Sequence, residues 1–314
     1  MRTRAPAKLL VLAMLLAAIV LSGCGLGAGS PPGSVQLLVS SDFGSRRVLA
    51  SGTPRVAGAE TVMRLLMRNA RARTRYGGGY VQSINGLAGG QQAGAPVDWF
   101  YYVNGVQATL GAAATQVHPG DQIWWDRHDW SQTDTVPAVV GSYPEPFLHG
   151  VDGKRLPVRI ECEAVAGRAC RTVAARLRAL GIPAALAAPG TGAGGHTLRV
   201  LVGLWARMMG DPAVHPIALG PRASGVYARF DAVGGALTLL DRDGRPVRTL
   251  LAGTGLIAAT RHGEDAPVWV VTGTSRAGLE RAAGAFERAT LLDRFAVALD
   301  PAGAIPLPAS GTGR

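Results

Sequence analysis

The fold is decided by three segments of one stretch: Val81-Gln82-Ser83-Ile84-Asn85-Gly86, Trp99-Phe100-Tyr101-Tyr102-Val103-Asn104-Gly105 and Gly120-Asp121-Gln122-Ile123-Trp124-Trp125-Asp126. Eight of the chain's eighteen Phe, Tyr and Trp residues lie between Tyr80 and Trp130. A core that needed only filler would use Leu and Val, as the rest of the chain does. Rings concentrated near two Asn-Gly turns therefore indicate a surface for a large, flat, partly polar ligand.

The elements around these segments predict a small mixed domain. Strands are expected at residues 79–84, 98–103 and 122–127, after an opening hairpin at 35–40 and 46–50. Between them, residues 60–71 have helical periodicity. This order fits a sheet with one helix packed on a face. We expect an α+β fold, in which an N-terminal β-grasp-like domain is followed by a second α/β domain.

Side chains alternate along each strand, so Trp99 and Tyr101 share one face and Phe100 and Tyr102 the other. One pair can then be core while the other is presented to a ligand. The alternative is that all four are core. Alternation also separates Trp124 and Asp126 from Trp125 and Arg127. His128 could coordinate a metal, including a corrinoid cobalt, but a hydrogen-bonded surface position is the favoured interpretation.

The N-terminus indicates export. Arg2, Arg4 and Lys8 precede an apolar run at residues 9–21 that ends in Leu21-Ser22-Gly23-Cys24. The run is too short to span a bilayer and has the length of a signal-peptide core. It resembles a bacterial lipoprotein signal, which implies acylation of Cys24, for example by palmitate, and a location on the extracytoplasmic face of the cell membrane. An ordinary secretory signal with an incidental Cys is the alternative.

Two cysteines remain, Cys162 and Cys170. Outside the cytoplasm such a pair predicts a disulfide, and two buried thiols are the alternative. No third Cys or nearby His completes a metal site, so no metal is expected.

The formal net charge of +11 comes almost entirely from arginine and is spread along the chain. We attribute it to codon bias and expect no nucleic-acid partner. Arg64, Arg68 and Arg71 lie on one side of the predicted helix. They could attract anionic headgroups beneath a lipid-anchored protein. The solvated side of an amphipathic helix is the favoured alternative.

The three segments, with a Gly-Ala segment at Gly111 to Ala114, together resemble the C-terminal domain of transcobalamin and intrinsic factor. Bacterial surface proteins carry a similar domain. The resemblance covers roughly residues 35–130 and implies a β domain that closes over one side of a corrinoid such as cobalamin. It places the lip of the site at Ser83, Asn85 and Gly86. It places a packing wall at Trp99, Phe100 and Tyr101, with the backbone of Leu110, Gly111 and Ala112 approaching the ligand. No large helical barrel precedes the domain, so the second α/β domain would serve either as the opposing wall of the site or as a docking module.

The expected organisation is a signal peptide at 1–23, a flexible tether at 24–34, the β domain at 35–130, a Pro-containing linker or packed strap at 131–156, an α/β domain of unknown role at 157–300 and a disordered tail at 301–314. No catalytic motif, phosphate-binding loop or dinucleotide fingerprint is present, so we expect no enzyme activity and no intrinsic cofactor. The leading hypothesis is a lipid-anchored corrinoid-binding protein that delivers its ligand to a membrane importer. The alternatives are a non-catalytic cell-envelope interaction protein and, behind both, a hydrolase of envelope polymers.

Overall fold

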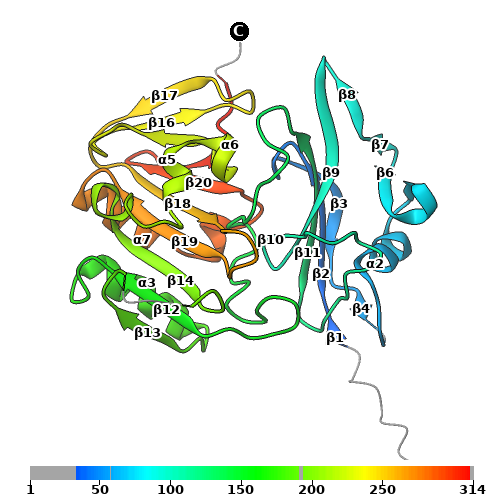
Figure 1. The fold of residues 1–314 in the computed structure, drawn as a ribbon, viewed down its shortest axis with the longest axis horizontal. Coiled ribbons are helices and arrows are strands. Elements are labelled where there is room, and N and C mark those ends of the chain that lie inside the picture. Colours follow the sequence, from blue (N-terminus) through cyan, green and yellow to red (C-terminus); the bar gives the residue numbers. More distant parts are fainter. Residues whose placement is uncertain (1–32, 57, 191–193, 312–314) are drawn as a thin grey trace, which may run out of the picture.

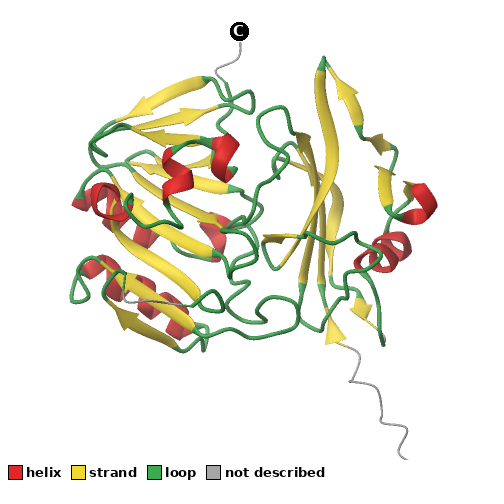
Figure 2. Cartoon of the chain, viewed as in Figure 1, coloured by secondary structure: helices red, strands yellow, loops and turns green. Residues whose placement is uncertain are grey.

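A computed structural model describes residues 33–56, 58–190 and 194–311. The predicted signal peptide, Cys24 and most of the tether lie outside the described residues. The chain forms two packed domains of mixed sheet and helix, which confirms the α+β prediction (Figure 1, Figure 2). Within the described ranges, no helix is both long enough and apolar enough to cross a bilayer.

The first domain is built on a sheet with the strand order β10-β9-β11-β2-β3. The predicted hairpin is present as β2 (Gln36–Ser41) and β3 (Arg46–Gly52). The other strands are β9 (Ala95–Val103), β10 (Val106–Gln107) and β11 (Gln122–Asp129), and β8 (Gly90–Gln92) pairs with β9. At the centre, β11 is parallel to β2 and antiparallel to β9. In a β-grasp domain the first and last strands of the sheet lie side by side and run parallel, as β2 and β11 do here.

A second layer covers the outer face of this sheet. The predicted helix is α2 (Val62–Asn69), which begins after Thr61, whose side chain accepts a hydrogen bond from the Arg64 amide. The strand expected at 79–84 is β6 (Tyr80–Ile84). It lies in a separate small sheet between β5 (Ala72–Arg75) and β7 (Leu87–Ala88), rather than beside β9. A short 3-10 turn, η1 (Tyr76–Gly78), joins β5 to β6, and β1 (Gly33–Ser34) pairs with β4 (Arg55–Val56).

The second domain contains a seven-stranded sheet of order β13-β12-β14-β19-β18-β20-β21. Four strands are parallel: β12 (Val158–Cys162), β13 (Ala184–Ala187), β14 (Leu198–Leu204) and β19 (Val268–Gly273). The others are β18 (Gly255–Thr260), β20 (Ala296–Asp300) and β21 (Gly303–Leu307). The helices α3 (Arg168–Ala179) and α7 (Arg276–Gly284) pack on one face. The predicted disulfide joins Cys162 at the end of β12 to Cys170 in α3.

Smaller elements complete this domain. A separate antiparallel sheet contains β15 (Ala228–Phe230), β16 (Leu237–Leu240) and β17 (Pro246–Leu250). The short helices are α4 (Trp205–Met208), α5 (His215–Ala218), α6 (Pro221–Ser224) and α8 (Arg288–Leu291). The disordered tail predicted from residue 301 is wrong for its first part, because β21 pairs with β20 and Leu307 is buried.

The two domains share one hydrophobic core. Tyr102 and Trp124 of the first sheet pack with Phe295, whose ring centroid lies 5.6 Å and 5.2 Å from theirs. Residues 131–156 cross between the domains, with Val139 buried in this shared core and Phe147 in the core beneath α3 and α7. This segment therefore packs against both domains. In Figure 1 the first sheet stands against the second domain on one side and carries α2 and β6 on the other.

Candidate functional site

Two rings of the expected aromatic wall are core residues. Trp99 is 7% exposed, and its Nε1 donates a hydrogen bond to the Leu87 carbonyl at 3.1 Å. Tyr101 is 8% exposed, and its hydroxyl contacts the Leu110 carbonyl and the Thr115 hydroxyl. Both lie in the core beneath α2. These rings hold the covering segments on the sheet, and in this structure neither presents a face to a ligand.

The third ring, Phe100, lies on the opposite face, within the domain interface. It stacks on His128 with ring centroids 4.5 Å apart, and Phe43 stacks on the same imidazole at 4.6 Å. The surface position expected for His128 is therefore wrong, because its ring is 1% exposed. The strand continues to Asp129 and the second domain covers this face, so the end of the strand is buried.

His128 belongs to a buried polar group that fixes the hairpin turn. Asp126 accepts hydrogen bonds from the amides of Phe43 and Gly44 at 3.1 and 2.9 Å, and its Oδ1 is 2.9 Å from His128 Nδ1. Ser40 donates to the same carboxylate at 2.5 Å. The carboxylate separates the hydroxyl from the imidazole, whereas a nucleophile and its base must touch each other. This arrangement therefore serves structure rather than acyl transfer. Nowhere in the described chain do three or more His, Cys, Asp or Glu residues form a metal-binding group.

Of the expected lip residues on the small sheet, Ser83 is buried, Asn85 is half-buried and Gly86 is exposed. Gly86, with φ of +88°, follows Asn85, with φ of +50°, in the turn after β6, and the Asn85 side chain accepts a hydrogen bond from the Arg71 amide. Ser83 and Gly86 line an open hollow of about 620 Å³ together with Arg71 and Arg73. Trp99, Phe100 and Tyr101, with which these positions were expected to form one site, do not line this hollow.

The loop from 108 to 118 supplies the remaining expected residues. Ala112 is buried and its carbonyl accepts the Met63 amide at 2.9 Å, while Gly111 is exposed. Leu110 is 63% exposed. Its carbonyl is held by Tyr101, whose phenol pKa is raised by burial and also by the Asp152 carboxylate, against a lowering by Thr115. The protonated phenol thus keeps the backbone of this loop in place.

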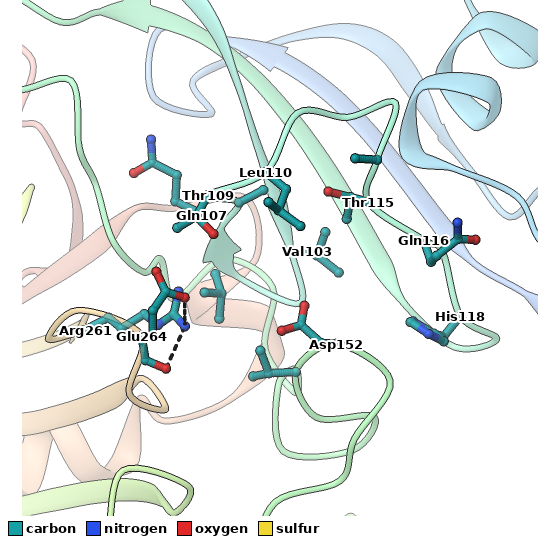
Figure 3. Close-up of a pocket in the computed structure, with 14 residues that line it drawn as sticks. Val103, Gln107, Thr109, Leu110, Thr115, Gln116, His118, Asp152, Arg261 and Glu264 are labelled. Carbon is teal, nitrogen blue, oxygen red and sulfur yellow. Dashed lines mark hydrogen bonds and ion pairs between the residues drawn. The ribbon is translucent and has the colours of Figure 1, made fainter. Parts of the chain in front are cut away.

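Leu110 lines a pocket of about 350 Å³ between the two domains (Figure 3). The first domain contributes the end of β9, β10 and the 108–118 loop. The strap contributes Val151 and Asp152, and the second domain contributes Arg261 and Glu264 from the loop after β18. In Figure 3 Leu110 and Thr115 lie above Asp152, with the Arg261–Glu264 pair to one side. A pocket with walls from two domains is a common place for a small-molecule site.

The polar groups of this pocket differ in availability. Arg261 is occupied, because its Nη2 lies 3.2 Å from Glu264 Oε2 and its Nε donates to the Asp265 carbonyl at 2.6 Å. Gln107 is also occupied, by the strap at Asp134 and Val136. Among the described residues, the side chains of Thr109, Gln116 and Asp152 make no hydrogen bond. These three can donate to or accept from a ligand that carries amide groups.

Of the nine expected ligand-binding residues, only Leu110 lines this pocket. Reasoning from the sequence missed Gln116, Asp152, Arg261 and Glu264, which lie on loops without periodicity. An Asp-Gly turn at 152 was the one local signal, and it predicts a turn rather than a site.

A family model described as a domain of unknown function (DUF4430) matches residues 59–129. The matched segment runs from before α2 to the end of β11. It contains the motifs that resemble the transcobalamin C-terminal domain and the first domain's wall of the pocket. A comparison with curated proteins found no match.

Proposed function

We propose that this chain is a lipid-anchored extracytoplasmic binding protein that holds a corrinoid such as cobalamin at the pocket between its two domains, and passes it to a membrane importer. The observation that carries the proposal is the composition of that pocket. The loop that the resemblance assigns to ligand contact, with its exposed Leu110, faces Asp152 and the Arg261–Glu264 pair. In this proposal the β domain forms one wall of the site, and the strap and the second domain form the opposing wall.

The pocket's size and chemistry support an edge-on mode of binding. Its volume of about 350 Å³ is at the small end of the range for ligand sites, so a macrocycle enters by one edge and remains partly exposed. The amide groups at that edge pair with Thr109, Gln116 and Asp152, while Leu110 packs on the apolar ring. The proposal gives no contact to Trp99, Phe100 or Tyr101.

Calorimetry and absorption spectroscopy with cyanocobalamin, on residues 25–314, test this proposal. Leu110→Asp places a charge on the apolar lip and is expected to weaken binding at least tenfold, since about 1.4 kcal/mol corresponds to a factor of ten. Leu251→Asp is the matched control, because Leu251 is 70% exposed and lies outside the pocket. The proposal is refuted if no heat or spectral shift appears up to millimolar ligand, or if the two variants lose affinity equally.

The second candidate function is a non-catalytic envelope interaction protein that uses the β domain as a scaffold. Both faces of the first sheet pack against other parts of the protein, and the sheet therefore presents no ring to solvent. This packing favours a scaffold role. The titration above decides between the two functions, since the scaffold alone requires no corrinoid binding.

A further inference from the structure

The outer side of the first domain carries a concentrated positive charge. Residues 53–97 contain six arginines and a single acidic residue, Glu60, whereas the whole chain has 32 basic and 21 acidic residues. The positive excess of the chain is therefore not evenly spread. We call these residues the arginine face: Arg55, Arg64, Arg68, Arg71, Arg73 and Arg75 on β4, α2, β5 and the turn between them. All six are exposed.

Most of these guanidinium groups have no partner within the protein. Arg68 pairs with Glu60 at 2.8 Å and donates to the Arg55 carbonyl. Across the described ranges, the side chains of the other five make no hydrogen bond or ion pair. Exposed cations gathered on one face repel each other, and an external anionic surface removes that repulsion. The face therefore has free binding capacity for anions.

The arginine face also carries exposed apolar side chains and an open hollow. Met67 of α2 is 51% exposed and Tyr76 of η1 is 85% exposed. A tyrosine with an apolar body and a polar tip suits the boundary between lipid and water. Arg71 and Arg73 line the open hollow of about 620 Å³ with Gln82 and Ser83. Arginine and hydroxyl donors converging on one hollow are suited to a phosphate-bearing headgroup.

The first described strand, β1, lies beside this face. Gly33 pairs with Val56 and Ser34 with Arg55, so β1 lies against the strand that carries the first of the arginines. In Figure 1 β1 and β4 lie at the outer edge of the first domain, on the side of α2. The nine residue steps from Cys24 to Gly33 span at most about 32 Å when extended. A lipid on Cys24 would keep this edge of the domain close to the bilayer.

From this combination we propose that the arginine face binds an anionic membrane surface, with headgroup phosphates at Arg71 and Arg73 and with Tyr76 and Met67 at the lipid boundary. This binding sets the orientation of the molecule, so that the first domain lies on the membrane and the second domain points away from it. The proposal does not rest on the corrinoid or on acylation, because the face itself supplies the attraction.

The test uses residues 25–314 without a lipid, in sedimentation with vesicles of phosphatidylglycerol and phosphatidylcholine or of phosphatidylcholine alone. We expect binding only to the anionic vesicles, weakening as salt rises. Replacing Arg64, Arg71 and Arg73 by Gln should lower the partition coefficient roughly a hundredfold, from the typical effect of each arginine near an anionic surface. The matched control replaces Arg178, Arg222 and Arg288 by Gln, three exposed arginines of the second domain, and should retain most of the binding.

Four results would overturn the proposal. One is equal binding to both kinds of vesicle, or to neither. Another is an equal loss in the control variant, which would show attraction to net charge alone. The third is binding to soluble poly(glycerol phosphate) but not to vesicles. Arginines on an edge strand such as β5 also discourage strand pairing between molecules. If that is their only role, the triple variant aggregates while its monomer keeps its affinity for vesicles, which also contradicts the proposal.

Discussion

Replacing Trp99 by Ala distinguishes a core ring from a ligand-binding ring. Trp99 is 7% exposed, lies in the core beneath α2, and donates a hydrogen bond to the Leu87 carbonyl. Removal of a buried Trp side chain costs about 3–5 kcal/mol, of which the hydrogen bond contributes about 1 kcal/mol. We therefore expect Trp99→Ala to lower the free energy of unfolding by about 4 kcal/mol.

Urea denaturation followed by circular dichroism measures this change. Trp99→Phe keeps most of the buried apolar area and loses the hydrogen bond, so it should cost about 1–2 kcal/mol. Its affinity for cyanocobalamin should remain within about twofold of the parent, because no ligand contact is expected at this position. A Trp99→Ala variant with an unchanged urea midpoint would refute the core role. A folded Trp99→Phe variant that binds the ligand tenfold more weakly would restore the ring to the site.

Three further predictions concern stability. Asp126→Ala leaves the Ser40 hydroxyl and the Phe43 and Gly44 amides without their acceptor and His128 Nδ1 without its partner, so it should cost about 3–5 kcal/mol in urea denaturation. A loss below about 1 kcal/mol would contradict the network. Replacing both Cys162 and Cys170 by Ser opens a short loop and should cost about 2.5 kcal/mol, whereas an unchanged melting temperature would count against the bond. Burial raises the pKa of Glu145 above 4.5, although hydrogen bonds from His149 oppose the shift. The folded chain then binds this proton more tightly than the unfolded chain, so the group's contribution to stability falls as pH rises from 4.5 through its folded pKa. Glu145→Gln should flatten the stability profile in that window, and an unchanged slope would show that Glu145 does not titrate there.

Local patterns predicted the elements of the first domain well. Alternation separated Trp124 from Trp125, and the structure buries them in different cores. The period of two is a property of the strand itself, so it survives any tertiary arrangement. The side chains that cover each face of the sheet come from segments that are distant in the sequence. The cover on the Trp124 side includes Phe295, far along the chain, and no pattern near Trp124 encodes that contact.

In the C-terminal tail, too, a tertiary contact decides the structure against the local pattern. Its Pro and Gly residues indicated disorder, yet residues 303–307 form an edge strand. Pro306 is tolerated there because an edge strand has a side without ladder hydrogen bonds. Pairing with β20 overrides the local composition. The pocket was predicted only in part for the same reason. A local motif indicated Leu110, whereas Asp152 and Arg261 reach the pocket only through tertiary packing.

The abundance of rings between Tyr80 and Trp130 follows from a sheet that is buried on both faces. Tyr102 and Trp124 face the second domain, while Tyr101 and Trp125 face α2. Each strand must therefore supply large apolar side chains at consecutive positions, which a ligand surface on one face would not require. The covering layers separate at the edge where β9 and β10 end and the 108–118 loop begins, and this opens the pocket that Leu110 lines. The proposed corrinoid therefore binds at that edge, with both domains as walls, because the broad aromatic surface is already occupied by the protein itself.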